Sequence, residues 1–304
     1  MPAVAGDDLV CAGGDTMQPL AQSWANAFHA RRPSVRVQIR DDAKLAADGF
    51  ALLLDEKIDC ALFVRELFPA ESAAFERKYG YAPLVIPVAG GSYATKGGTH
   101  AIAIYVNAGN PLNRISLAQL ASVFAGARYW GELGVEGAFA THPIHLYGML
   151  HRRETGNPPG IVNFLQQRVL HGAAFRDDAR EQVDRPGEGA LEAIPRRVAE
   201  DPDGIGYSGF GFAVAGAKSV AIGDSDAGPF YRGTPEEVTR GVYPLRRHIY
   251  LIVHRRPGAP LSPPLQSFLR FVLSAKGQSL LADDRTRFLP LPPAEAASAR
   301  ALLE

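Results

Sequence analysis

The chain has 304 residues, of which 46% are hydrophobic and 21% charged, and this composition is typical of globular proteins rather than disordered or fibrous ones. Its 32 basic and 32 acidic residues cancel, so overall charge gives no attraction to nucleic acid or to an anionic membrane. No apolar run reaches the roughly 18 residues that a membrane-spanning helix needs. This length suits two lobes of ordinary domain size.

The first stretch, LVCAGGDTMQPLAQSWANAF (residues 9–28), predicts a strand, a glycine-rich turn and a helix. Thr16 is expected to cap the helix through its hydroxyl. Met17, Leu20 and Trp24 then recur near the helical period, which predicts that one face of this helix is buried.

The next elements continue the same alternation. SVRVQI (residues 34–39) alternates as a second strand, a helix is expected to end near Leu54, and IDCALFV (residues 58–64) is typical of a buried third strand. Strands that alternate with helices predict a parallel sheet with right-handed crossovers.

The rest of the chain also has an α/β pattern. Ser116 and Gln119 have the spacing of a capping box and predict a helix start. The other expected elements are a helix at 71–80, strands at 83–89, 101–107 and 248–253, and helices at 115–126 and 265–282.

The two cysteines, Cys11 and Cys60, each lie inside an apolar stretch. Free cysteine packs as a small hydrophobe, so two buried thiols are the favoured interpretation. A disulfide is the alternative, and it requires an oxidising compartment.

Several separated segments together resemble one family, the phosphate-binding proteins of phosphate ABC transporters, within the type 2 periplasmic binding proteins. The segments occur in the family's order and cover most of the chain. They are GGDTMQPLAQSWANAF, DCALFVRELFPAESAAFERKYGYAPLVIPVA, IYVNAGNPLNRISLAQLASVFAG, DGIGYSGFGFA, YPLRRHIYLIV and FLRFVLSAKGQSLL.

The resemblance implies a two-lobed α/β fold with mixed, mostly parallel sheets, two crossing strands and a ligand cleft between the lobes. Lobe I is expected to comprise residues 1–100 and 248–304, and lobe II residues 101–247. The resemblance also implies a periplasmic protein whose signal peptide has been removed, since the first ten residues lack the basic and apolar segments of a secretion signal.

Family members bind phosphate mainly through backbone N–H groups and small hydroxyls at helix starts, together with one arginine. The first of these loops should be Gly14, Asp15, Thr16 and Met17, where the start of a helix offers unpaired N–H groups and a positive dipole end. An ordinary helix start is the alternative. Arg65 is a further candidate donor, although a salt bridge to Glu66 or a surface position is favoured.

The second lobe's candidate loop is HRRETGNPPGIVNFL (residues 151–165), where the family carries an arginine followed by Ser-Gly-Thr. Asn157 is expected to cap the helix and Pro158 to occupy its first position. Pro158 and Pro159 would then remove up to two N–H donors from the anion site. The candidate ligand-binding residues of this loop are Arg152, Arg153, Thr155, Gly156 and Asn157.

Other departures from the family pattern lie in the first lobe. Asp41 and Asp42 stand where small neutral residues are expected, and carboxylates facing a phosphate must be protonated or paired. Val64 stands where a small polar or acidic residue is common. Lost donors and added carboxylates lead to the hypothesis that the fold is kept while phosphate affinity falls by roughly 100-fold or more.

The resemblance implies a solute-binding component of an ABC transporter that binds phosphate or a related oxyanion, acts as a monomer with the transporter permease as partner, and needs no cofactor. It implies neither catalysis nor nucleic acid binding. The alternatives are a protein of the same fold with another ligand, cationic or zwitterionic, and a ligand-free interaction or sensory module.

Three further motifs resemble functional sites but are not expected to act as such. GIGYSG (residues 204–209) fits a dinucleotide fingerprint, but it follows a helix end and runs into a strand-like segment. Ser208 is a weak nucleophile candidate because Phe210 replaces the last glycine of the nucleophile elbow. His142 and His145 have no second pair with ligand spacing, so no metal site is expected.

Overall fold

The computed structural model describes residues 8–149 and 156–304. The chain divides into two compact units, the first formed by residues Met1–Thr99 and Arg247–Glu304 and the second by His100–Arg246. Within the described residues, no helix combines the length and the apolar character that crossing a bilayer requires.

The first unit is built on one mixed sheet of six strands. The strands in sheet order are β14 (Phe288–Leu289), β4 (Leu84–Ser92), β13 (His248–Val253), β3 (Cys60–Phe63), β1 (Leu9–Ala12) and β2 (Val37–Arg40). Strands β1, β2 and β3 are parallel, as the sequence predicts, whereas β13 runs antiparallel to both β3 and β4.

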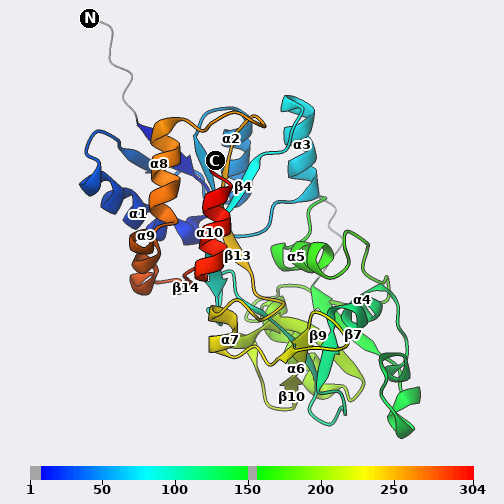
Figure 1. Cartoon of the computed structure of the whole chain (residues 1–304). Helices are drawn as coiled ribbons and strands as arrows, with labels where there is room; N and C mark the ends of the chain where they lie inside the picture. Colours follow the sequence, from blue (N-terminus) through cyan, green and yellow to red (C-terminus); the bar gives the residue numbers. More distant parts are fainter. Residues whose placement is uncertain (1–7, 150–155) are drawn as a thin grey trace, which may run out of the picture. The chain divides into compact units, whose positions relative to one another are not determined.

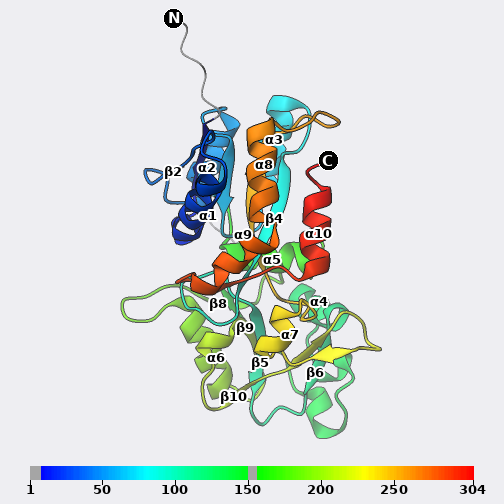
Figure 2. The ribbon, with the colours of Figure 1, turned by 60° about the vertical axis from the view of Figure 1, so that its left-hand side comes forward.

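Helices cover both faces of this sheet (Figures 1 and 2). On one face Trp24 and Phe268 pack over β1, β3, β4 and β13, and on the other face Phe50 and Phe75 pack over β3. The helices are α1 (Gln18–Arg31), α8 (Pro263–Val272), α9 (Ala275–Ser279) and α10 (Pro293–Ala301) on the first face and α2 (Ala46–Leu54) and α3 (Pro69–Tyr79) on the second.

The single helix expected over residues 265–282 is wrong, because the chain turns at Ser274. The Ser274 hydroxyl donates to the Phe271 carbonyl at 2.6 Å and accepts the N–H of Gly277 at 3.1 Å. It therefore ends α8 and caps α9, which runs on into the 3₁₀ turn Leu280–Asp283.

The second unit contains a five-stranded and a three-stranded sheet. Helix α6 packs on the larger sheet (Figure 2). Ile194 and Val198 of this helix belong to one buried cluster with Tyr105 and Tyr147 of the sheet. In sheet order the strands are β10 (Ala217–Ser219), β5 (Ile102–Asn107), β9 (Gly204–Gly209), β7 (His145–Met149) and β8 (Arg180–Gln182), then β12 (Phe230–Tyr231), β11 (Ala221–Gly223) and β6 (Arg114–Ser116). The helices are α4 (Leu117–Ala125), α5 (Gly160–Arg168), α6 (Ala190–Glu200) and α7 (Pro235–Thr239).

Two expectations for the second unit are confirmed. The capping box at the start of α4 is present, since the Ser116 hydroxyl accepts the N–H of Gln119 and the Gln119 side chain accepts the N–H of Ser116. GIGYSG is the buried strand β9 and opens no α-helix, so it lacks the context of a dinucleotide fingerprint.

The expectation of two free thiols is wrong, because Cys11 and Cys60 form a disulfide. They are register partners on the adjacent parallel strands β1 and β3, and their Cα atoms lie 4.7 Å apart. This separation is within the range that a disulfide bridges. The bond closes a loop with a sequence separation of 49 and joins the two strands next to the glycine turn.

We predict that replacing both cysteines by alanine lowers the free energy of unfolding by about 4 kcal/mol, the loop-closure entropy that such a cross-link removes from the unfolded chain. Urea denaturation followed by circular dichroism would measure the change. Reductant should destabilise the parent chain and leave the double variant unaffected. Equal unfolding midpoints for parent and variant would contradict the prediction.

Candidate functional site

The loop after β1 passes unusually close to strand β3. Gly13 has φ +111° and Gly14 has φ +34°, in the left-handed region that favours glycine. A Cβ atom on either residue would lie 2.8 or 2.9 Å, respectively, from the carbonyl oxygen of Leu62. Only glycine therefore permits both the turn and the close approach of the two backbones.

Two other contacts fix the same loop. A Cβ on Gly49, in the first turns of α2, would lie 2.6 Å from the carbonyl oxygen of Ala12, so α2 also approaches this corner closely. The side-chain amide of Gln18 donates to the carbonyls of Gly13, at 3.2 Å, and Ala43, at 2.9 Å. The corner thus joins the ends of β1 and β3 to the segment before α2.

Most N–H groups of this loop are used within the protein. Asp15 N–H donates to the Lys44 carbonyl and Met17 N–H to the Gly14 carbonyl, both at 2.8 Å. Thr16 N–H donates to the Asp15 carboxylate at 2.7 Å. A 3₁₀ turn, Asp15–Met17, precedes α1, so Met17 rather than Thr16 is the N-cap residue and the predicted Thr16 cap is wrong.

Two donors of the corner remain available. Among the described residues, neither the N–H of buried Gly14 nor the hydroxyl of half-buried Thr16 donates a hydrogen bond. Buried N–H groups are nearly always paired in native proteins, so this N–H group calls for an acceptor. The Thr286 hydroxyl donates to the Thr16 carbonyl at 3.1 Å and so holds this residue in place.

Carboxylates surround the same ends of the parallel strands. Asp42 pairs with the guanidinium of Arg40 at 2.5 and 2.9 Å, and the hydrogen bond from Arg40 lowers the pKa of this carboxyl group. Asp48 accepts the N–H groups of Lys44 and Leu45 and belongs to the start of α2. Asp41 is exposed. Of the two aspartates expected to repel an anion, Asp42 is therefore paired by an arginine.

The carboxylate partner of Arg65 is Glu71 and not the expected Glu66, whose backbone carbonyl accepts a hydrogen bond from Arg65 at 3.0 Å. The Arg65 guanidinium donates to the two carboxylate oxygens of Glu71 at 2.6 and 2.8 Å and lies 3.8 Å from the ring centre of Phe68. Glu66 instead pairs with buried Arg247 at 2.5 Å. Bidentate pairing and ring stacking both hold the Arg65 side chain in one orientation.

The candidate loop of the second unit is described only in part, because Arg152, Arg153 and Thr155 lie outside the described residues. Gly156, with φ +91°, and Asn157 are exposed.

The predicted Asn157 cap is wrong, since α5 begins at Gly160 with Pro159 as its N-cap residue. Pro158 and Pro159 both precede the first helical residue. Each proline restricts the residue before it to an extended backbone, which keeps Asn157 and Pro158 out of the helix. As the N-cap residue, Pro159 removes one of the four N–H groups of this helix start, whereas Pro158 lies before it and removes none.

Ser208 and Tyr207 lie inside the second unit. The Ser208 hydroxyl is a donor to the Leu191 carbonyl at 2.6 Å and Ser208 is fully buried, which leaves it unsuited as a nucleophile. The Tyr207 hydroxyl accepts the N–H of Met149, and burial raises the pKa of this phenol above its usual value.

Comparison with known proteins identifies the family to which this chain belongs. Residues 2–276 match the family model described as a PBP superfamily domain. The chain belongs to the PBP superfamily. It is 30% identical over 294 residues to the phosphate-binding protein PstS of Pseudomonas aeruginosa, an alignment that covers 94% of this chain and 83% of PstS.

Solved structures agree on the fold. PstS from Borrelia burgdorferi superimposes with a TM-score of 0.58 at 16% identity, covering 93% of this chain and 98% of the other. An ABC-type phosphate transport receptor from Vibrio cholerae gives a TM-score of 0.54 at 16% identity, covering 92% and 99% of the two chains. The predicted resemblance and the mixed α/β fold class are confirmed by the family model, PstS and these structures together. The expectation of mostly parallel sheets is wrong, because six of the eleven strand pairings among the described residues are antiparallel.

We predict that Gly13→Ala lowers the free energy of unfolding by about 3 kcal/mol, because it adds a steric clash with a backbone carbonyl to the cost of left-handed φ. Gly80→Ala is the matched control: its φ is +82° and nothing lies within 4 Å of the added atom. It should cost about 1 kcal/mol. Equal losses in urea denaturation would show that the close approach to β3 contributes nothing.

Proposed function

We propose that this chain is the phosphate-binding, solute-binding component of an ABC transporter. The observation that carries the proposal is the donor pair of the glycine corner, the buried Gly14 N–H and the Thr16 hydroxyl, which lacks a protein acceptor in the described part of the chain. The Pseudomonas relative is named a phosphate-binding protein and the Vibrio protein a phosphate transport receptor, and both names support the choice of ligand.

The position of the donors fits an oxyanion. They lie after the carboxyl end of β1 and before α1, and in open α/β sheets ligands bind outside the carboxyl ends of the strands. Neutral donors can surround a phosphate without a compensating positive charge, and the start of α1 adds the favourable end of a helix dipole. Gly14 and Thr16 are thus the proposed direct contacts, with Asp15 and Met17 shaping the turn.

The other candidate contacts are supported by different observations. Arg65 would contact an anion only through guanidinium edges that Glu71 does not use. The second unit offers its own candidate loop, with exposed Gly156 and Asn157 as the described members. Arg152, Arg153 and Thr155 remain proposed contacts on the strength of the family resemblance alone.

Two observations weaken the hypothesis of reduced phosphate affinity. Only Pro159 belongs to the start of α5, so one N–H donor is lost there and not two, and Asp42 is paired with Arg40. Asp15 and the exposed Asp41 remain as negative groups near the corner. Phosphate is therefore the proposed ligand. If binding tests instead find a cationic or zwitterionic ligand, these two carboxylates would account for it.

The proposal also includes the cellular compartment of the protein and its partner. The Cys11–Cys60 disulfide suits an oxidising compartment such as the periplasm, because reducing compartments keep thiols free. We further propose that the two compact units are the lobes of the binding protein, that the monomer delivers its ligand to a transporter permease, and that it neither catalyses a reaction nor binds nucleic acid.

Isothermal titration calorimetry with phosphate, on protein stripped of ligand by partial unfolding and refolding, tests the proposal. We expect one phosphate per chain with a micromolar or lower Kd. Thr16→Val should weaken binding about tenfold, the effect of about 1.4 kcal/mol for one lost hydrogen bond to a charged group.

Thr141→Val is the matched control, because the Thr141 hydroxyl is exposed in the second unit and donates only to the nearby Ala138 carbonyl. It should leave the Kd unchanged. Absence of saturable phosphate binding by the refolded parent chain would overturn the proposed ligand. Equal Kd values for the parent chain and Thr16→Val would overturn the proposed contact.

A further inference from the structure

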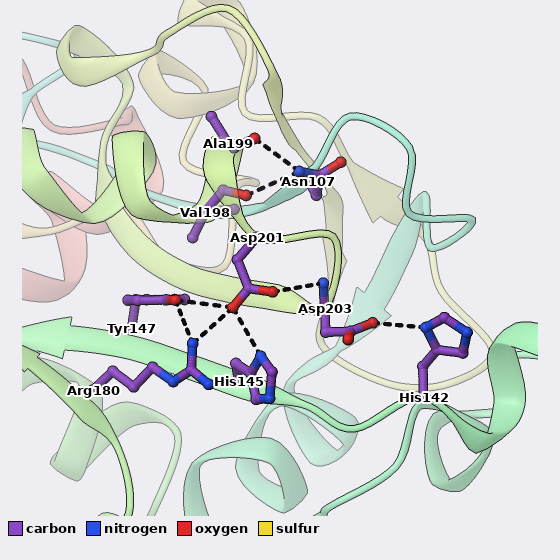
Figure 3. Close-up of polar contacts among 9 residues, drawn as sticks. All are labelled: Asn107, His142, His145, Tyr147, Arg180, Val198, Ala199, Asp201 and Asp203. Atoms are coloured by element: carbon purple, nitrogen blue, oxygen red, sulfur yellow. Dashed lines mark hydrogen bonds and ion pairs between the residues drawn. The ribbon is translucent and has the colours of Figure 1, made fainter.

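Two turns of the second unit bring two histidines and two aspartates together (Figure 3). His145 is the first residue of β7 and His142 lies three residues before it, and Asp201 and Asp203 lie in the turn between α6 and β9. Strands β7 and β9 pair in parallel with His145 opposite Gly204, so turns about 60 residues apart in sequence become neighbours.

The four side chains form two hydrogen-bonded pairs, and three of them bring their donor atoms close together. His145 Nδ1 lies 2.8 Å from Asp201 Oδ2, and His142 Nδ1 lies 2.8 Å from Asp203 Oδ1. One donor atom each from His145, Asp201 and Asp203 lie within 4.8 Å of one another. A tetrahedral zinc ion with bonds of about 2.0–2.2 Å needs donors roughly 3.4 Å apart, so small side-chain rotations would complete the geometry.

The surrounding residues hold these donors in position. The Tyr147 hydroxyl and Arg180 Nη1 both donate to Asp201 Oδ2 at 2.9 Å, and the N–H of Asp203 donates to Asp201 Oδ1 at 3.0 Å. The ring of His142 stacks on Phe139 with centroids 4.5 Å apart. Ligands whose orientation is already supported lose little conformational freedom when a metal binds.

Charge also favours a cation. Asp201 and Asp203 contribute two negative charges and Arg180 one positive charge, which leaves one negative charge when both imidazoles are neutral. Their side chains are partly exposed, Asp203 by 20% and His145 by 28%, so an ion can reach them from solvent. The backbone is fixed as well, since His145 N–H donates to the Asp203 carbonyl at 3.0 Å.

We propose that His145, Asp201 and Asp203 form a three-ligand zinc site in the second unit, with a water molecule in the fourth position. An imidazole nitrogen beside carboxylate oxygens suits Zn²⁺ and similar transition metals, whereas Ca²⁺ and Mg²⁺ prefer all-oxygen sites. The ion would join the α6–β9 turn to the start of β7 and stabilise this end of the sheet. This site is independent of the proposed phosphate contacts.

Calorimetric titration of ZnCl₂ into the full chain, after removal of metals with EDTA, tests the site. We expect one saturable Zn²⁺ per chain and a rise in melting temperature on binding. His145→Ala and Asp203→Asn should each weaken binding at least about tenfold, since even residues that only support a ligand have effects of this size. Circular dichroism would establish that both variants are folded.

His248→Ala is the matched control, because His248 faces a single carboxylate, Glu295, at 3.0 Å in the first unit. It should bind Zn²⁺ as the parent chain does. The proposal is overturned if the parent chain shows no saturable binding, or if folded His145→Ala and Asp203→Asn bind Zn²⁺ with unchanged affinity. It is also overturned if His248→Ala loses as much affinity as they do.

Discussion

The first unit depends on the close approach of two backbones, the loop after β1 and strand β3. Gly13 and Gly14 lie against the Leu62 carbonyl, and no side chain fits between them. The Cys11–Cys60 bond joins the same two strands a few residues earlier, so a covalent link and a steric fit act on one corner. A loop fixed in this way can hold a donor at a defined place before any ligand arrives.

This rigidity matters to the proposed site because the corner itself offers few donors to a ligand. The N–H groups of Asp15, Thr16 and Met17 already have acceptors within the protein, which fixes the turn but takes these groups away from a ligand. Within the described part of the chain, the Gly14 N–H and the Thr16 hydroxyl are left without an acceptor. Binding to a preformed corner avoids the entropy cost of ordering a loop, and this saving offsets a small number of contacts.

The sequence predicts those features of the fold that depend on local pattern. The alternation of strands and helices and the Ser116 capping box are examples, because each depends on neighbours in the chain. The Cys11–Cys60 disulfide could not be deduced, since it requires the register of β1 against β3. The same holds for the histidine and aspartate cluster, which exists only because β7 and β9 pair. The start of α1 is displaced by a 3₁₀ turn that no residue pattern indicates.

Amide chemical shifts in an ¹⁵N-labelled chain, followed through a phosphate titration, test residue by residue whether the glycine corner contacts phosphate directly. If it does, the Gly14 resonance moves downfield and saturates with one phosphate per chain, with smaller shifts at its neighbours in the loop. A saturating titration in which the Gly14 resonance does not move would contradict a direct contact.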